Sequence, residues 1–469
     1  PDTPAHTIGE YPKAKSNSKC LLRAIGTQAT ATCGNYNLCA GLQAGIEGAV
    51  HAVRAVFEDP SLIPPPETDP PSSQPLTQAE NEPAPPPPPP DPAPNLADMA
   101  MDDVLASIAA DAGLTAAETS AVLLVDATNG FNELGRKAML WTVRHRWANG
   151  ARFSFNCYRH SSQLLLRRRG GECAIILSRE GVTQGDPLSM VLYGLSLTPL
   201  AEAIRRAVPT VVQPWYADDA AMAGPITGIR DAQRLLIELG PQRGYYPEPD
   251  KSILISPPAT SPDALAPVAE FNFKQLDGHR YVGGFVGSGA AEAAWIDPQI
   301  QQWVSGVEEL AKVAKRFPQT AYAGLARSLQ AEWQYLQRVT PNVADAFAPI
   351  ERAIATKFLL ALLDESEAGI AAIRDILALP VKFGGLGIPD PCETPEHCYQ
   401  SSKEGTALLR DSLVQGFAFC TASFKAEAGR ARRETKARRK AVLQTHFEAL
   451  LALGCALLVT DVPLDPPQK

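Results

Sequence analysis

The chain has 469 residues and a net charge of −8, and 45% of its residues are hydrophobic. This length allows about two to four domains with sizeable cores. The acidic balance excludes binding to nucleic acid through the overall field, so any such contact must be local. The nine cysteines lack CxxC or zinc-finger spacing and no apolar run could span a membrane, which favours an intracellular protein without membrane contact. The chain begins with proline, and we expect it to be a fragment of a longer protein.

The first predicted elements are a helix, a proline-rich stretch, a second helix and a strand. Apolar residues at helical spacing predict an amphipathic helix that ends near residue 57: Ile46, Ala49, Val50, Val53 and Val56. Residues 58–97 are rich in proline, which suits neither a helix interior nor a central strand, so we expect an extended linker or surface insertion. A short helix is expected at 102–114, followed by an apolar strand that ends in Asp126.

The middle of the chain alternates helices and short strands. Residues 129–147 predict one helix, with Leu134, Ala138, Trp141 and His145 near one face. Residues 172–190 predict a strand, a loop and a helix capped by Asp186 with Pro187 in its first turn. Residues 211–223 predict two strands around a turn at Asp218 and Asp219. Further elements are a helix at 232–240, strands at 252–256 and 281–287, and mostly helices from about residue 292.

This order of elements predicts an α+β core with acidic residues at strand ends. If the strand before Asp126 pairs with the strands around Asp218 and Asp219, three carboxylates converge on one edge of the sheet. Such a cluster is unfavourable alone and favourable around divalent cations, and two magnesium ions held this way can clamp a phosphoryl transfer. The alternative is that Asp218 and Asp219 only form a hairpin turn and Asp126 only a turn or helix cap.

Five sequence stretches occur in an order that resembles a known family. They are LLVDATNGF, EGVTQGDPLSMVLY, WYADD, GYYPEPDKS and YVGGFVG. They resemble the successive palm motifs of reverse transcriptases of non-LTR (LINE-type) retrotransposons, and LCAGLQAGIEGAVHAV, SLQAEWQYLQRV and LPVKFGGLGIPDP resemble flanking segments of that group. The resemblance covers most of residues 20–400. It implies a right-hand polymerase with an antiparallel palm sheet, partial fingers and a helical, thumb-like C-terminal region.

The resemblance also implies domain limits and partners. Residues 1–57 would be partial fingers, 58–97 the linker or insertion, 98–290 the palm with fingers strands, and 291–469 the thumb-like helical region. The implied activity is RNA-directed DNA polymerisation, a nucleotidyl transfer that extends a DNA primer with dNTPs on an RNA template, and the incomplete fingers leave open whether the enzyme is active.

By resemblance, Asp126 and Asp218 would be the main ligands of two Mg²⁺ ions, for which Mn²⁺ can substitute. Asp219 would complete the acidic cluster, and the carbonyl of Ala127 would be a further ligand. Phe131 would block the 2′ position of the incoming sugar, so that deoxynucleotides fit and ribonucleotides clash. Without the motif, Phe131 is an ordinary core residue at a strand-to-helix junction.

Other implied site residues are Gln184 and Gly185, where an amide and a close backbone approach would serve the nucleotide or template. Tyr216 belongs to the same substrate-binding set. Lys251 would neutralise or protonate pyrophosphate, with a solvated turn lysine as the alternative. Residues 281–284, YVGG, resemble a primer-grip hairpin.

Basic segments provide the local footprint for nucleic acid. Residues 144–169 interleave arginines with aromatics, which suits a template track or a solvated face over a partly buried aromatic strand. Residues 430–440, RARRETKARRK, predict a cationic helix that could contact nucleic acid or direct nuclear import, so we expect a nuclear location. The family's basic fingers segment is missing. Lys13, Lys15 and Lys19 are available cations for the triphosphate, and nothing fixes one of them.

Two further functions stay open. A decayed or domesticated polymerase domain would bind nucleic acid without catalysis, and the truncated fingers and the acidic net charge favour it. An RNA-dependent RNA polymerase could use the same scaffold, although Phe131 and a YADD rather than a GDD sequence argue against it. The template, the insertion target and the oligomeric state are not set by the sequence.

Overall fold

The computed structural model describes residues 11–64, 119–167 and 171–461, without the side chains of 11–15 and 453–461. The N-terminal part forms α1 (Tyr11–Cys33), α2 (Gly45–Glu58) and the short 3₁₀ turn η1 (Pro60–Leu62). The amphipathic helix predicted near residue 57 is α2, and its apolar face is buried. Most of the proline-rich stretch and the helix predicted at 102–114 lie outside the described residues.

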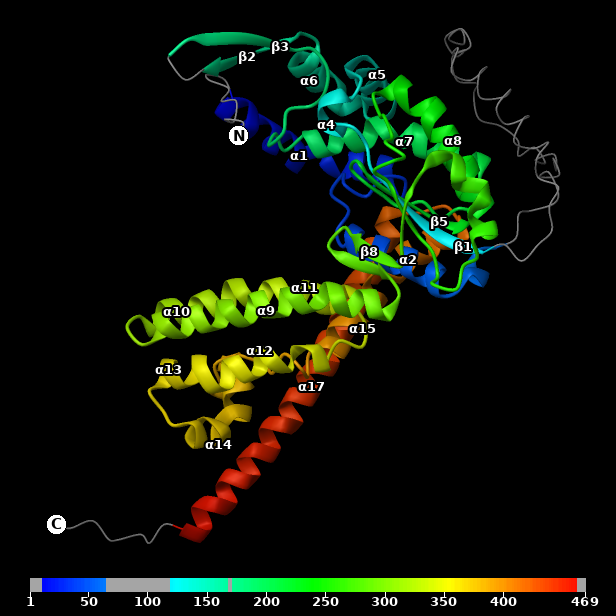
Figure 1. Ribbon diagram of the computed structural model, residues 1–469. Helices are drawn as coiled ribbons and strands as arrows, with labels where there is room; N and C mark the ends of the chain where they lie inside the picture. The colour runs from blue at the N-terminus through cyan, green and yellow to red at the C-terminus, as the bar shows by residue number, and fades with distance from the viewer. Residues whose placement is uncertain (1–10, 65–118, 168–170, 462–469) are drawn as a thin grey trace, which may run out of the picture.

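A five-stranded sheet forms the centre of the molecule (Figure 1). Its strands, in spatial order, are β4 (Trp215–Tyr216), β5 (Asp219–Pro225), β1 (Ser120–Val125), β6 (Ile253–Ile255) and β7 (Lys274–Leu276). The first four strands are antiparallel, but β7 runs parallel to β6, so the sheet is mixed and the expectation of a purely antiparallel sheet is wrong. The chain can run parallel here because η3 (Pro262–Phe271) returns it between the two strands.

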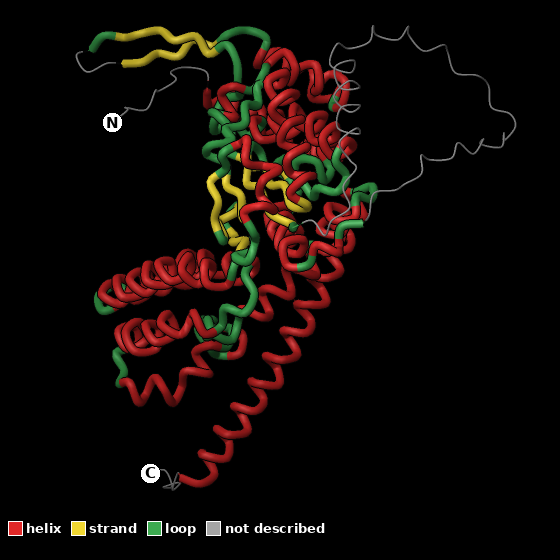
Figure 2. The backbone as a smooth tube through the Cα atoms, turned by 45° about the vertical axis from the view of Figure 1, so that its right-hand side comes forward, coloured by secondary structure: helices red, strands yellow, loops and turns green. Residues whose placement is uncertain are grey.

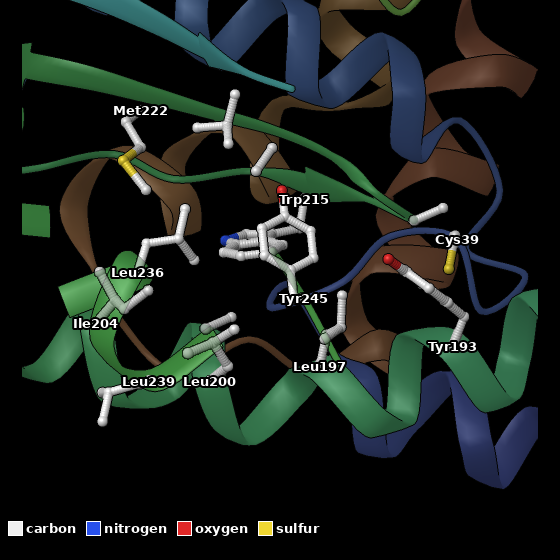
Figure 3. Packing of buried hydrophobic residues seen from close by; sticks show 14 of the residues in the cluster. Cys39, Tyr193, Leu197, Leu200, Ile204, Trp215, Met222, Leu236, Leu239 and Tyr245 are labelled. Carbon is white, nitrogen blue, oxygen red and sulfur yellow. The ribbon is translucent and has the colours of Figure 1, made fainter. Parts of the chain in front are cut away.

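Both faces of this sheet are buried, because alternate residues of each strand point to opposite sides. One face packs against α7 (Ser189–Ala207) and α8 (Ile226–Leu239), and Figure 3 shows Trp215, Tyr245 and Met222 in this core. The other face carries Val122, Ala221 and other apolar residues against α2 and C-terminal helices. The sheet is therefore enclosed by segments from both ends of the chain.

The region after β1 differs from the single helix predicted at 129–147. It forms α4 (Gly130–Glu133) and α5 (Arg136–Arg146), separated at Leu134–Gly135. The break has a tertiary cause, because the Leu134 carbonyl accepts from the Gly181 amide and the Gly135 amide donates to the Arg243 carbonyl. Of the residues predicted near one face, Leu134 is buried but Trp141 is 52% exposed, and the buried residues of α5 include Met139, Thr142 and Val143.

The basic segment 144–169 is not built on an aromatic strand. Its aromatics lie on α6 (Ala148–Tyr158) or next to it, and a hairpin of β2 (Ser162–Arg167) and β3 (Cys173–Ser178) follows. Trp147 and Tyr158 are core residues, 2% and 5% exposed, so they cannot stack on bases. Phe155 is 50% exposed and remains available.

The start of α7 lies two residues later than predicted. Asp186 was expected as the N-cap and Pro187 in the first turn, but the helix begins at Ser189. The Asp186 carboxylate accepts from the Leu188 amide at 3.1 Å and the Asp186 carbonyl from the Ser189 amide at 3.0 Å. These bonds make a separate turn before the helix, which is a common use of aspartate.

A second hairpin, β8 (Gly278–Tyr281) and β9 (Gly284–Gly287), follows the sheet. Residues 281–287 were predicted as a short strand and 281–284 as resembling a hairpin, and the structure has a hairpin whose turn lies within 281–284. Val282 and Gly283 have φ of 39° and 86°, so both central residues of the turn are left-handed, as in a type I′ turn.

The C-terminal part is helical, as predicted from about residue 292. Long helices and single turns alternate, and buried Trp303, Trp333, Phe347 and Phe358 centre a separate core. In Figures 1 and 2 these helices project away from the sheet. In the described part of the chain, no helix is both long and apolar enough to cross a membrane.

The remaining elements are helices and short helical turns. They are η2 (Gly240–Arg243), α9 (Gly289–Ala314), α10 (Pro318–Gly324), η4 (Leu325–Leu329), α11 (Gln330–Val339), η5 (Asp345–Phe347), α12 (Ala348–Ala353), η6 (Ile354–Phe358), α13 (Leu359–Leu363), α14 (Glu367–Ala378), η7 (Val381–Phe383), α15 (Pro395–Gly405), α16 (Ala407–Gln415) and α17 (Thr421–Asp461).

Candidate active site

The three aspartates lie at one edge of the sheet. β1 and β5 are neighbours, and Val125 pairs with Ala220 at the end of their ladder. The next residue on each strand is an aspartate, Asp126 on one side and Asp219 on the other. Tyr216 pairs with Asp219 across the turn that contains Asp218. The strand ends next to Asp126 and Asp219 are therefore neighbours in the sheet, as predicted.

The aspartate turn is held by residues from distant parts of the chain. Ala217 has φ of 57°, an unusual conformation for a residue with a Cβ. The buried Asn37 side chain stabilises it, because its amide donates to the Ala217 carbonyl and its oxygen accepts from the Ala217 amide, both at 3.3 Å. The Tyr245 hydroxyl donates to the Asp218 carbonyl at 3.0 Å. The turn is thus fixed from two sides.

Asp126 is fixed through its backbone. Its amide donates to the Ser252 hydroxyl at 3.1 Å, and its carbonyl accepts from the Glu248 amide at 2.8 Å. Ala127 forms a β-bridge with Pro247, and the hydrogen bonds of this bridge use the neighbouring residues. The Ala127 carbonyl therefore takes no part in the bridge, which leaves it usable as a ligand.

The carboxylates influence one another electrostatically. Partial burial raises the pKa of Asp218, and the charge of Asp126 raises it further. Burial also raises the pKa of Asp219, with added repulsion from Asp218 and Asp126, while Arg280 of β8 opposes the shift. The raised pKa values of Asp218 and Asp219 disfavour a fully ionised cluster unless a cation joins the carboxylates.

Phe131 lies beside the aspartate turn. Its ring stacks on Tyr193 of α7, with the centroids 4.5 Å apart. Gly130, the residue before it, packs so closely that a Cβ at this position would lie 2.8 Å from the Asp218 Cβ and 2.6 Å from the Tyr193 hydroxyl. A glycine is required there, and it places Phe131 next to the carboxylates.

Lys251 lies in the turn that leads to β6. Its ammonium group forms an ion pair with Glu248, whose other oxygen accepts from Thr128. The bond to Glu248 raises the pKa of Lys251, and the charge of Asp126 adds to this shift. The side chain is 62% exposed, so Lys251 is a protonated, accessible cation near Asp126.

Gln184 and Gly185 are exposed in the loop before α7. Gly185 has φ of 85°, which favours glycine. The same loop packs on the backbone of Phe131, since the Val182 amide donates to the Phe131 carbonyl at 2.9 Å. The loop is therefore attached to the residue predicted as the steric gate.

The 281–284 hairpin turn packs between the sheet and the C-terminal helices. The Tyr281 hydroxyl donates to the Pro214 carbonyl at 3.4 Å, and the Tyr335 hydroxyl to the Val282 carbonyl at 3.0 Å. A Cβ at Gly284 would lie 2.8 Å from Val50 of α2. The predicted primer-grip segment thus lies close to the strand that carries Tyr216.

The other cations expected to contact nucleic acid or the triphosphate lie on α1, α5, α6 and β2 or next to them. Arg144, Arg152, Arg159 and Arg167 are exposed. Arg146 instead forms an ion pair with Glu202 at 2.6 Å. Lys19 is exposed on α1, whereas the side chains of Lys13 and Lys15 lie outside the described residues. These positions do not single out one cation as the group that would bind the triphosphate.

The sequence did not point to three residues that shape the site. Asn37 clamps the aspartate turn, Tyr245 bonds to Asp218, and Tyr193 carries Phe131. The Tyr193 hydroxyl is buried and has no hydrogen-bond partner in the described part of the chain. A signal for Asn37 existed in the stretch CGNYNLCAG, whose Gly and Asn residues mark a structured loop.

The chemistry of this edge fits magnesium. Among the described residues, no group of three or more His, Cys, Asp or Glu side chains is placed to hold a metal ion. Magnesium is commonly held by only one or two carboxylates, with water and substrate phosphates in its other positions. The aspartates repel one another, and the β-bridge does not use the neighbouring Ala127 carbonyl. Together these oxygens provide a few ligands for a magnesium ion and leave its other positions open for water and phosphates.

Comparisons with known proteins give distant similarities. No protein-family model and no curated protein matches the chain. Apo telomerase from Candida tropicalis is similar at 10% identity and a TM-score of 0.33, over 67% of this chain and 54% of that one. Telomerase from Candida albicans in complex with a TWJ fragment of telomeric RNA is similar at 10% identity and a TM-score of 0.29, over 61% and 50% of the two chains.

A Candida tropicalis telomerase truncated from its C-terminal domain is similar at 12% identity and a TM-score of 0.29, over 40% of this chain and 38% of that one. The chain thus spans about half the length of these structures or less. Superpositions at such TM-scores carry no conclusion about activity.

Proposed function

We propose that the protein is an RNA-directed DNA polymerase of the non-LTR retrotransposon type. The observation that carries this proposal is the position of Asp126 and Asp219 at adjacent ends of paired strands, with Asp218 in the turn between β4 and β5. The order of the five motifs along the chain adds to it. The substrates would be dNTPs, a primer 3′-hydroxyl and an RNA template.

Each site residue has a defined task in this reaction. Asp126, Asp218 and the Ala127 carbonyl would hold two magnesium ions, with Asp219 completing the acidic edge. When bound, the ions would lower the pKa of the primer hydroxyl and neutralise the phosphates. Phe131, held by Tyr193, would exclude a 2′-hydroxyl. Lys251 keeps its proton beside Asp126 and would offer it to pyrophosphate.

Gln184 and Tyr216 would border the nucleotide site from opposite elements. Gln184 belongs to the loop bonded to Phe131, and Tyr216 to the strand paired with Asp219. Gly185 keeps the loop in a conformation that other residues rarely adopt. These contacts would orient the base and sugar, so that the α-phosphate lies over the carboxylates.

Primer extension on an RNA template with magnesium tests this function. We expect wild-type protein to add dNTPs and Asp218→Asn to lose at least about 100-fold in rate, more than the loss of an outer partner of a metal ligand costs. Asp263→Asn is the matched control, because Asp263 is exposed in η3, away from the strand ends. Equal rates for wild type and Asp218→Asn would contradict the proposal.

The second candidate is a polymerase-like domain that binds nucleic acid without catalysis. The acidic net charge of −8 favours it, and no described side chain is identified as the triphosphate ligand. Filter binding of an RNA–DNA hybrid, run beside the extension assay, separates the two functions. Binding without extension by the wild-type chain would support the second candidate.

A further inference from the structure

The cationic stretch of α17 is not used by the proposed active site. Residues 430–440 contain seven arginines or lysines and one glutamate, in a chain whose net charge is −8. The stretch is helical, as predicted, and its Arg and Lys side chains are exposed. Figures 1 and 2 show α17 as a long helix that leaves α15 and extends away from the rest of the molecule.

The spacing of the cations places most of them on one face of α17. With 3.6 residues per turn, six cations between 425 and 440 fall within an arc of about 120°. They are Lys425, Arg432, Arg433, Lys436, Arg439 and Lys440. We call these six residues the basic face. Since the rise is 1.5 Å per residue, the basic face extends along about 22 Å of the helix.

The glutamates of α17 lie on another side of the helix. Glu427, Glu434 and Glu448 repeat at multiples of seven residues and so share a different arc of the helix. Arg438 lies near that arc and forms an ion pair with Glu404 of α15. In the part of the chain that the structure describes, no residue of the basic face forms an ion pair. The basic face is therefore uncompensated.

The side of α17 that packs on the protein is also defined. Phe424, Ala428 and Thr435 are buried, and α17 contacts α15 and α16. Arg433, Lys436 and Lys440 point away from this side, whereas Arg432 and Arg439 border cavities of about 300 and 620 Å³ against α15. The first three cations are therefore the most accessible to a large partner.

We propose that the basic face binds double-helical nucleic acid through its phosphates, without reading sequence. A line of cations on a rigid helix matches the regular phosphates of a duplex. Surfaces for single strands combine cations with aromatic side chains that stack on bases, and residues 425–440 contain no aromatic. The exposed side of this stretch has no large apolar residue, so it lacks the anchor that a membrane-surface helix uses.

This binding goes beyond the proposed catalysis, and it can be tested without it. The 469-residue chain carrying Asp218→Asn is titrated into a labelled 20-base-pair RNA–DNA hybrid at several KCl concentrations. The test variant adds Arg433→Ala, Lys436→Ala and Lys440→Ala. We expect its Kd at about 100 mM salt to rise at least tenfold, and the salt slope to fall by about two to three, since each phosphate contact contributes about 0.9.

The matched control removes the same charge elsewhere. Arg206→Ala, Arg234→Ala and Lys274→Ala remove exposed cations from α7, α8 and β7. We expect this variant to bind the hybrid within about twofold of the parent protein. Equal losses in both variants would overturn the proposal in favour of a general charge effect. An unchanged slope in the test variant would overturn it directly.

Two further arms exclude other partners. A 20-nucleotide single strand that loses as much affinity as the duplex would identify a single-strand surface instead, and phosphatidylserine vesicles released only by the test variant would identify a membrane surface. The far-ultraviolet circular dichroism of both variants must match the parent, which the exposure of all six side chains leads us to expect.

Discussion

Asn37 fixes the position of the aspartate turn from a loop that lies 180 residues earlier in the sequence. Its side chain bonds to both backbone groups of Ala217 and also accepts from the Cys39 amide at 3.2 Å. We expect Asn37→Ala to destabilise the protein by about 1–3 kcal/mol, because it leaves buried backbone groups without partners. Urea unfolding measures this loss.

The same substitution separates positioning from binding. The Ala217 turn would lose its clamp, so primer extension should fall at least about tenfold while hybrid affinity stays within about twofold. Ser154→Ala is the control, because Ser154 is equally buried but bonds only within α6, and it should leave extension unchanged. Wild-type extension by Asn37→Ala would show that the turn does not need its clamp.

Phe131 allows a test of sugar selection at a single residue. Phe131→Ala should lower the preference for dNTPs over rNTPs by about 10–100-fold, since a packed side chain that excludes one group is worth about 1–3 kcal/mol. Competitive incorporation measures the preference. Tyr193→Phe keeps the ring stacked under Phe131 and removes only an unpartnered hydroxyl, so discrimination should persist. Unchanged discrimination in Phe131→Ala would show that another residue excludes the 2′-hydroxyl.

At the residue scale, the carboxylates of the site could be predicted from the sequence, whereas the residues that hold them in place could not. Asp126 follows a short continuous apolar run, which predicts a buried strand, and Asp218 lies in the turn predicted between two short strands. Asn37 and Tyr245 act through hydrogen bonds to backbone atoms far away in sequence. No local pattern encodes such partners, because they exist only once the sheet has formed.

At the scale of elements, the errors have tertiary causes. The helix predicted at 129–147 breaks at Leu134–Gly135 because Gly181 and Arg243 take its backbone hydrogen bonds. α7 starts late because Asp186 uses its carboxylate for a turn rather than for a cap. α2 matches its prediction, because its apolar periodicity agrees with its packing. The helices predicted at 232–240 and 430–440 are present, but they are parts of the longer α8 and α17.

α2 gives the protein a pH dependence that can be measured. Burial lowers the pKa of His51 from its ordinary 6.5 to about 3, and three nearby cations add to the effect. The ring accepts from or donates to the Ser402 hydroxyl at 2.9 Å. The unfolded chain binds a proton at this site below about pH 6.5 and the folded protein does not, so this contribution to stability is full above pH 6.5 and declines as pH falls toward 3.

His51→Asn should therefore weaken the acid sensitivity of unfolding. Between pH 6 and pH 4.5 the wild type should lose up to about 1.4 kcal/mol per pH unit more than the variant. Urea midpoints at several pH values give this difference. His145→Asn is the control, because it makes the same replacement at a histidine that is exposed on α5. Parallel profiles for wild type and His51→Asn would contradict the burial argument.

At the scale of the whole molecule, segments that are far apart in the sequence pack against one another. α2 lies within residues 1–57, which are predicted to be partial fingers, and it packs directly on the central sheet, whose strands lie within 98–290. The Arg54 guanidinium donates to the Phe285 carbonyl at 2.6 Å and pairs with Glu292 at 2.7 Å, which joins α2 to β9 and α9. Asn35 bonds to Ser412 of α16 at 3.1 Å. The sequence could not show these contacts, because they link residues hundreds of positions apart.

This packing predicts that residues 119–290 alone do not form the native sheet. Val122, Ala221 and Ile255 would lose the cover of α2, and a fully buried Val or Ile contributes about 1.5–3 kcal/mol. Several such losses approach the about 5–15 kcal/mol that stabilises a domain. We expect the segment to be compact with helical circular dichroism, but to bind a hydrophobic dye and lack a cooperative urea transition, unlike the full chain. A sharp transition in the isolated segment would mean that the packing of α7 and α8 on one face of the sheet suffices for folding. The role of α2 would then be to position the aspartates rather than to stabilise the fold.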